Sequence, residues 1–258
     1  MAFTFGSSAV RITTPTAADL FSDLVGRLSR GEGFAVATLN LDHLVKLRRS
    51  ERYRRAYAAQ THVVADGNPS VWLARLAGER VDLVPGADLM TPLLALAAER
   101  GVPVAFCGAT EETLARSQAA LEAAHGGLRV VSRLAPSFPF DPDGPEADAV
   151  IAKLGSSGAR LCLLALGAPR QEILAARAHA ALPHIGFVSI GAGLDFAAGT
   201  QRRAPVLFRR MALEWLWRAL QDPRRLGPRY LACALILPSL TLAAVRHRLG
   251  RGSAPAAG

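Results

Sequence analysis

The residue best placed to do chemistry is Asp66, which directly follows the apolar stretch His62-Val63-Val64-Ala65. That stretch is typical of a short buried strand, and Gly67 with Pro69 after it predicts a turn into a helix. A carboxylate at the carboxyl end of such a strand lies where open α/β sheets place their active sites, and it could act as a general base. The alternative is that Asp66 only caps the helix, and its position alone does not decide between these roles.

Four further apolar stretches end in polar or glycine-rich turns. These turns are Thr38 with Asn40, Gly108 with Thr110, Gly167 to Gln171, and Gly191 to Asp195. In a parallel sheet all of these ends lie on one edge, where together with Asp66 they form a ligand crevice. Glycine turns that lead into helices expose backbone N–H groups that favour anions, so phosphate groups are the expected ligands.

Other active-site patterns fit the sequence less well. Gly191-x-Gly193 is half of a dinucleotide fingerprint, but the third glycine is missing and the pair comes late in the chain. Asp141-Pro142-Asp143 could suggest a metal-bridged nucleotide sugar, yet its proline-rich surroundings favour a turn. No phosphate-binding P-loop, G-x-S-x-G motif or histidine pair is present, and the three cysteines are widely spaced. We therefore expect no metal, no cofactor and reduced cysteines in a cytosolic setting.

The elements that must position these residues alternate along the chain. We expect strands at Gly33–Leu39, His62–Ala65, Val102–Cys107, Leu128–Ser132, Arg160–Leu166 and Ile185–Ile190, with helices between them. The strands are continuous apolar runs rather than alternating patterns. This pattern predicts an α/β fold with a Rossmann-like, mainly parallel sheet covered by helices on both faces.

The positive charge is confined to the C-terminal part of the chain. Residues 199–258 carry 11 arginines against Glu214 and Asp222, which accounts for the whole net charge of +9. We therefore expect three parts: a catalytic core over residues 1–198, a helical basic appendage over 199–249, and a disordered tail over 250–258. Within the appendage we expect a helix from Val206 to Gln221. The arginines imply an anionic partner, namely acidic lipid, ligand phosphates or nucleic acid.

The appendage also contains an apolar run from Tyr230 to Val245, flanked by arginines on both sides. The run is shorter than the roughly 20 residues needed to span a bilayer, and its basic flanks suit a segment that lies in a membrane interface. Trp215 and Trp217 occur among leucines, so packing or membrane contact is favoured over stacking on nucleic acid. No signal peptide is visible at the N-terminus, so we expect a cytoplasmic protein, peripheral on the inner face of the cell membrane.

Six short stretches, in this order, resemble the WecG/TagA/CpsF family of bacterial glycosyltransferases. They are Thr38-Leu39-Asn40; Ala65-Asp66-Gly67 with Val71-Trp72; Gly86-Ala87-Asp88-Leu89; Gly167-Ala168-Pro169-Arg170-Gln171-Glu172; Gly191-Ala192-Gly193-Leu194-Asp195-Phe196-Ala197-Ala198-Gly199 with Arg203-Ala204-Pro205; and Leu213-Glu214-Trp215-Leu216-Trp217-Arg218 with Pro223-Arg224-Arg225. The resemblance implies a Rossmann-like, inverting, metal-independent transferase. Such enzymes move a sugar from a UDP-sugar, often N-acetylmannosamine, to a sugar on a polyprenyl diphosphate.

The resemblance also implies roles for individual residues. Asp66 matches the family's proposed general base. We expect the substrates to contact Thr38, Asn40, Gly67, Gly86, Asp88 and Gln171. We expect the nucleotide and its phosphates to contact Gly108, Gly167, Gly191, Asp195, Arg218, Arg225 and Arg229. In the family, arginines of the appendage close over the nucleotide.

Two positions depart from the family pattern. A third appendage arginine would fall near Pro228, so the neighbouring Arg229 is assigned its role. Leu83 stands where many members have an arginine, and Arg80 is the nearest substitute.

Two other functions stay open. One is a non-catalytic protein of the same fold that binds a nucleotide-sugar or a lipid phosphate. The other is nucleic-acid binding through the arginines, which predicts salt-dependent DNA retention; we expect no nucleic-acid partner. A homo-oligomer also stays open.

Overall fold

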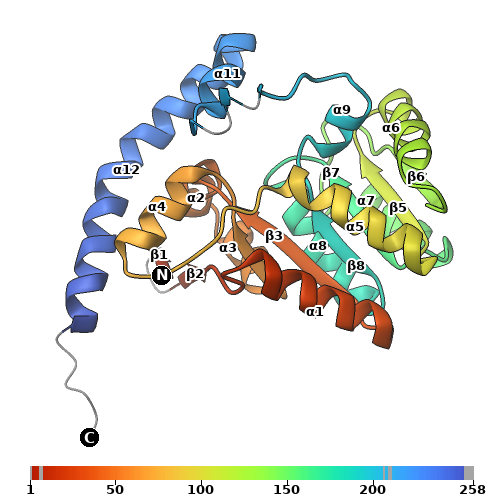
Figure 1. Cartoon of the computed structure of the whole chain (residues 1–258), viewed down its shortest axis with the longest axis horizontal. Coiled ribbons are helices and arrows are strands. Elements are labelled where there is room, and N and C mark those ends of the chain that lie inside the picture. The colour runs from red at the N-terminus through yellow and green to blue at the C-terminus, as the bar shows by residue number, and fades with distance from the viewer. Residues whose placement is uncertain (1, 6–7, 206, 209–210, 253–258) are drawn as a thin grey trace, which may run out of the picture.

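The structure is a computed structural model that describes residues 2–5, 8–205, 207–208 and 211–252, without the side chains of residues 225, 251 and 252. Its centre is a six-stranded sheet in which every neighbouring pair is parallel, with the order β4-β3-β8-β7-β5-β6 (Figure 1). The strands are β3 (Phe34–Leu39), β4 (His62–Ala65), β5 (Val104–Gly108), β6 (Val130–Leu134), β7 (Leu161–Ala165) and β8 (Gly186–Ser189). The predicted parallel sheet is confirmed, although β6 begins two residues later than expected. A short antiparallel hairpin of β1 (Ala2–Phe5) and β2 (Ser8–Arg11) precedes it.

Helices cover both faces of the sheet, as continuous apolar strands require. One face packs against α1 (Ala17–Arg30), α5 (Gly86–Arg100) and α6 (Glu111–Ala124). The other face packs against α3 (Glu51–Ala58), α7 (Pro145–Ser156) and α8 (Arg170–Ala181). Successive residues of β3 divide between these layers, because Phe34 and Val36 belong to the first core and Ala37 and Leu39 to the second. The Rossmann-like α/β arrangement is thus confirmed.

The helices that lead from the strands to the site are short. α2 (Leu41–Arg49) follows β3, α4 (Asn68–Leu76) follows β4, and α9 (Gly193–Ala197) follows β8. Each begins at the carboxyl end of its strand, so the turns that precede α2, α4, α8 and α9 share one edge of the sheet. This edge is where the sequence predicted the crevice.

The predicted helix from Val206 to Gln221 is wrong in its first half. The backbone of Ala212 has a φ of 61°, in the left-handed region that interrupts a helix, and α11 begins only at Glu214 and ends at Gln221. Residues 206, 209 and 210 lie outside the described residues. The following helix, α12, runs from Pro223 to Gly252, so residues 250–252 of the expected tail are helical, and residues 253–258 lie outside the described residues.

One face of α12 packs against the domain. Cys233, Ile236, Leu240 and Ala244 are buried, at the three- and four-residue spacing of a single helix face, where α12 lies against α2 and α4 (Figure 1). The opposite face exposes leucines: Leu231, Leu235, Leu242 and Leu249. Within the described residues, Leu226–Gly250 is long and apolar enough to cross a membrane, with a mean hydropathy of 1.5.

Candidate active site at the carboxyl edge of the sheet

Asp66 is fixed at the end of β4 by the sheet itself. Its backbone N–H donates to the carbonyl of Leu39 at 2.9 Å, one step beyond the pairing of Leu39 with Ala65. Gly67 then takes a φ of 84°, which an L side chain rarely adopts, and the chain turns at once into α4 with Pro69 in its first turn. Asp66 makes no side-chain cap for this helix, since the N-cap residue is Gly67 and no side-chain cap bond is formed.

Two side chains from the end of β3 hold the carboxylate of Asp66. The hydroxyl of Thr38 lies 3.4 Å from Oδ2 and the Nδ2 of Asn40 lies 3.3 Å from the same oxygen. The side-chain amide of Asn40 cannot be flipped without losing a hydrogen bond. As the N-cap of α2, its Oδ1 accepts from the backbone N–H of His43 at 3.0 Å. Both donors therefore fall on Oδ2, and among the described residues no donor lies on Oδ1.

The electrostatic surroundings make Asp66 a stronger base than an ordinary aspartate. Burial raises the pKa of its carboxyl, and the negative charge of Glu214 raises it further. The hydrogen bonds from Asn40 and Thr38 and the charge of Arg218 lower the pKa, but the net shift is upward. A carboxylate whose pKa lies nearer to neutral accepts a proton more readily from a hydroxyl.

A buried hydrogen-bond chain supports Thr38 from behind. The hydroxyl of Tyr57 donates to the backbone carbonyl of Thr38 at 2.9 Å, and Nδ1 of His43 lies 2.7 Å from the same hydroxyl. Because the single proton of Tyr57 is used by the carbonyl, Nδ1 of His43 must donate. Burial lowers the pKa of His43 to about 3, so its ring is neutral. His43 and Tyr57 are thus structural, and they hold the end of β3 in place.

Among the appendage arginines assigned to phosphate, Arg218 acts on carboxylates at this edge of the sheet. It lies on α11, and its positive charge acts to lower the pKa of both Asp66 and Asp195. Arg229 instead pairs with Asp42 on α2, at 3.1 Å. The side chain of Arg225 lies outside the described residues.

The predicted glycines separate into two kinds. A Cβ on Gly86 would lie 2.8 Å from the carbonyl oxygen of Ser189, and one on Gly108 would lie 2.5 Å from the carbonyl carbon of Ala165, so packing requires both glycines. Cβ atoms on Gly167 and Gly191 would meet nothing within 4 Å, although both have positive φ values. Gly167 and Gly191 therefore leave open space beside their backbone, as a phosphate-binding turn needs.

Gln171 and Asp88 are both engaged with neighbouring charges. Gln171 is buried, and its Nε2 donates to Oε1 of Glu172 at 2.8 Å, whereas its Oε1 has no partner among the described residues. Asp88 at the start of α5 pairs with Arg203 at 2.5 Å. Its neighbour Gly86 approaches Thr38, since a Cβ there would lie 3.4 Å from Cγ2 of Thr38.

Two charged residues at this edge were not predicted. Arg203 is partly buried. Its hydrogen bond to Asp88 and the charge of Asp88 raise its pKa above the usual value, and the charges of Glu214 and Asp66 add to this rise. Glu214, at the start of α11, raises the pKa of Asp66. In the sequence, Arg203 stands out only as part of a stretch that resembles the family, and nothing in its spacing indicates a partner 115 residues away on α5.

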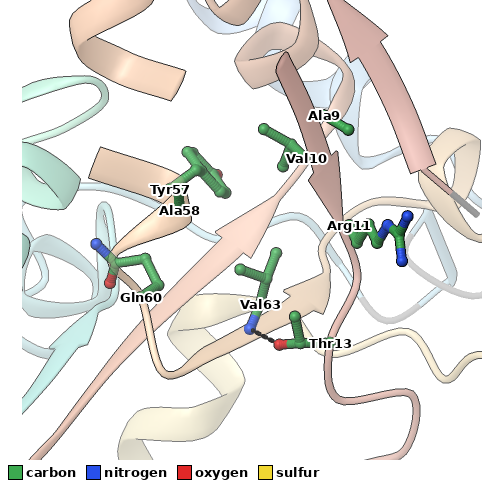
Figure 2. A pocket seen from close by; sticks show the side chains of 8 residues that line it. All are labelled: Ala9, Val10, Arg11, Thr13, Tyr57, Ala58, Gln60 and Val63. Atoms are coloured by element: carbon green, nitrogen blue, oxygen red, sulfur yellow. Dashed lines mark hydrogen bonds between the residues drawn. The ribbon is translucent and has the colours of Figure 1, made fainter. Parts of the chain in front are cut away.

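A separate cavity of about 190 Å³ lies between β2, the end of α3 and β4 (Figure 2). Its wall includes Tyr57 and Gln60, and beside them Thr13 accepts from the N–H of Val63 at 2.8 Å. None of the residues expected to bind substrate or phosphate lines it.

A comparison with protein-family models identifies one match to this chain. The model described as the glycosyl transferase WecG/TagA/CpsF family matches residues 7–253. The match includes β3, β4, α11 and all of α12, and thus every residue of the site described above.

Proposed function

The chain belongs to the WecG/TagA/CpsF family of glycosyltransferases, and from this membership we propose that it moves a sugar from a UDP-sugar to a sugar carried on a polyprenyl diphosphate. UDP-N-acetylmannosamine is the donor we propose to test first. The transfer inverts the anomeric carbon, needs no metal ion and serves surface-polysaccharide or cell-wall polymer synthesis. The observation that carries the proposal is Asp66, a carboxylate held at a strand end by Thr38 and Asn40 with its pKa raised.

The proposed reaction is a single displacement. Asp66 takes the proton of an acceptor hydroxyl while the oxygen of that hydroxyl forms a bond to the anomeric carbon of the donor. The bond between the anomeric carbon and the diphosphate breaks, and its electron pair leaves with UDP. The two donors on Oδ2 hold the carboxylate still, and Oδ1 is the oxygen that we assign to the acceptor hydroxyl.

The departing diphosphate needs positive charge, and in this proposal the protein supplies it without a metal. Arg218 acts on both Asp66 and Asp195, so its guanidinium lies near the base and near α9. A guanidinium binds phosphate oxygens in pairs, and the open turns at Gly167 and Gly191 add backbone N–H groups. Arg203, held by Asp88, contributes a further charge. Glu214 opposes this set and keeps Asp66 basic before the donor binds.

We also propose that α12 lies in the membrane interface rather than across the bilayer. From Cys233 to Ala244 its buried face lies against α2 and α4, so lipid cannot surround this part of the helix in this arrangement. The exposed leucines of the opposite face suit the acyl region, and Arg224, Arg246 and Arg248 suit anionic headgroups. On this proposal residues 1–198 are the catalytic core, and residues 199–249 are an appendage that places the core at the inner face of the membrane.

The experiment that tests the function is turnover with defined substrates. The purified protein is incubated with a panel of UDP-sugars and a short polyprenyl-diphosphate sugar, and UDP release is measured together with the anomeric configuration of the product. We expect release with one donor and an inverted product. Binding of a UDP-sugar without any release across the panel would favour the non-catalytic alternative, and a retained configuration would exclude the single displacement.

A further inference from the structure

Asp42 on α2 joins two parts of the protein that the proposed chemistry uses separately. Nζ of Lys46, one helical turn further along α2, lies 2.6 Å from Oδ2 of Asp42, and Nη2 of Arg229 on α12 lies 3.1 Å from the same oxygen. The side chain of Asp42 is only 9% exposed. Burial raises the pKa of its carboxyl, but the charges of Arg229 and Lys46 outweigh burial and hold that pKa below its usual value. Asp42 is therefore an ionised carboxylate shared by two cations.

Lys46 connects this carboxylate to the turn that follows β7. Its Nζ also donates to the backbone carbonyl of Ala168 at 3.1 Å. The carbonyl of Gly167 accepts from the N–H of Gln171 at 3.2 Å, so donors of the protein occupy both carbonyls. The N–H groups of Gly167 and Ala168, by contrast, have no partner among the described residues. A turn with free N–H groups and occupied carbonyls suits an anion, and loss of the Lys46 contact would free a carbonyl oxygen that repels phosphate.

Arg229 connects the same carboxylate to the helix that carries Arg218. It precedes Tyr230 on α12, and the ring of Tyr230 packs edge-to-face on Trp215 of α11, with the ring centroids 5.7 Å apart. Arg218 follows Trp215 by three residues, about one turn along α11. Burial raises the pKa of Tyr230, and the charges of Arg218 and Arg229 both oppose that rise. Through Arg229, Asp42 therefore fixes the part of α12 on which the helix of Arg218 packs.

The docking of α12 does not by itself explain this three-way contact. Apolar side chains from Cys233 to Ala244 already pack α12 on α2 and α4, and Arg48 of α2 donates to the hydroxyl of Ser239 at 2.8 Å. A buried ion pair adds little net stability over apolar packing, because its desolvation offsets the attraction of the charges. The contact at Asp42 is better explained by the geometry that it imposes on its two cations.

We propose that Asp42 is a positioning residue for the departing diphosphate of the donor. It holds Lys46 against the turn at Gly167 and holds Arg229 against α2, so that this turn and Arg218 approach the same diphosphate. The inference rests on the proposed function, because that function assigns the turn and Arg218 to the diphosphate. Asp42 is itself an anion and does not contact the phosphates.

The change Asp42→Asn separates positioning from plain electrostatics. Asparagine keeps the shape of the side chain but removes its negative charge. If Asp42 were only a nearby charge, its removal would strengthen the binding of an anionic diphosphate. Positioning predicts the opposite, a rise of about 10-fold or more in the Kd for UDP, the size of one charge-assisted hydrogen bond. Uridine lacks the phosphates, and its Kd is expected to change by less than about twofold.

Calorimetry with UDP and with uridine is carried out on the wild type, on Asp42→Asn and on three further variants. Lys46→Met keeps the pair of Asp42 with Arg229 and tests the turn alone, so it decides the question if Asp42→Asn does not fold. It is also expected to raise the Kd for UDP about 10-fold and to leave that for uridine unchanged. Lys46→Arg keeps a cation beside Asp42 and is expected to retain most of the affinity. Arg48→Gln is the control, because it removes a contact between α2 and α12 that does not involve the turn.

A double-mutant cycle measures the link between Asp42 and Arg218. Because Asp42 acts partly through Arg218, Asp42→Asn is expected to raise the Kd for UDP by a smaller factor in an Arg218→Gln background than in the wild type. Fully additive effects would overturn the link through α12.

An unchanged or lower Kd for UDP in Asp42→Asn, or an equal rise for UDP and uridine, would overturn the proposal. So would an Arg48→Gln variant that weakens UDP binding as much as Asp42→Asn does. If the wild type transfers sugar while Asp42→Asn and Lys46→Met bind UDP normally, this inference is wrong and the proposed function stands. If UDP binding depends on Asp42 but the wild type transfers no sugar, the proposed function is wrong and the positioning role stands.

Discussion

Replacing Glu172 by Gln is expected to stabilise the protein increasingly as the pH rises. Glu172 is fully buried beside Gln171, and burial raises the pKa of its carboxyl from 4.5 to about 7, although the amide of Gln171 opposes the rise. In the unfolded chain the carboxyl ionises near its ordinary value. Between these two values the folded state keeps a proton that the unfolded state has lost, so stability falls as the pH rises and stays lower above pH 7.

The expected size follows from the two pKa values. The interval from 4.5 to about 7 corresponds to about 3 kcal/mol, at roughly 1.4 kcal/mol for each pH unit. Glutamine does not ionise, and its side-chain oxygen still accepts from Gln171. The variant is therefore expected to match the wild type near pH 4 and to exceed its free energy of unfolding by up to about 3 kcal/mol near pH 8.

Urea unfolding of both proteins across this pH range measures the difference. The control is Glu32→Gln, because Glu32 is exposed and pairs with Arg30 at 2.9 Å, which lowers the pKa of Glu32. Its effect is expected to be small and of opposite sign. A difference for Glu172→Gln that does not change with pH, or a variant less stable than the wild type near pH 8, would refute the reasoning.

Three further predictions follow from packing, surface and charge. Gly86→Ala is expected to destabilise the fold by about 1–3 kcal/mol in urea unfolding, because the new Cβ would lie 2.8 Å from the backbone oxygen of Ser189. Gly26→Ala serves as the control and is expected to stabilise the fold by up to about 1 kcal/mol. Its new Cβ would meet only the movable end of the Arg30 side chain. The double change Leu231→Gln with Leu235→Gln removes two leucines whose side chains are 63% and 73% exposed. It is expected to lower binding to anionic vesicles without changing the thermal midpoint of unfolding. Unchanged vesicle binding would contradict the interfacial role of α12. Transfer activity is expected to persist after dialysis against EDTA. If the activity disappears and returns with a divalent cation, the arginines alone do not neutralise the charge of the departing diphosphate.

The core of the candidate site could be predicted because parallel strands end at one edge. Thr38, Asn40 and Asp66 lie at the ends of two apolar runs. Parallel pairing of β3 and β4 is enough to predict that these three side chains lie close together. The double role of Asn40 needed the structure, since the sequence shows a cap residue or a ligand residue but not both at once.

The C-terminal arginines could not be placed from the sequence. No local pattern indicates that Arg203 pairs with Asp88 or that Arg229 pairs with Asp42, because both partners lie far away in the chain. The helix predicted from Val206 failed at Ala212, an alanine in the left-handed region, which local propensity does not predict. Tertiary contacts decide these positions.

The central claim is that Asp66 is the general base, and the change Asp66→Asn tests it most directly. Asparagine keeps the shape of the side chain and can still contact Thr38 and Asn40, but it cannot take a proton. Sugar transfer is measured as kcat with a UDP-sugar and a polyprenyl-diphosphate acceptor, and the Kd for UDP is measured by calorimetry on the same preparation. We predict a fall in kcat of at least about 100-fold with the Kd for UDP unchanged within about twofold. Transfer at close to the wild-type rate would contradict the claim.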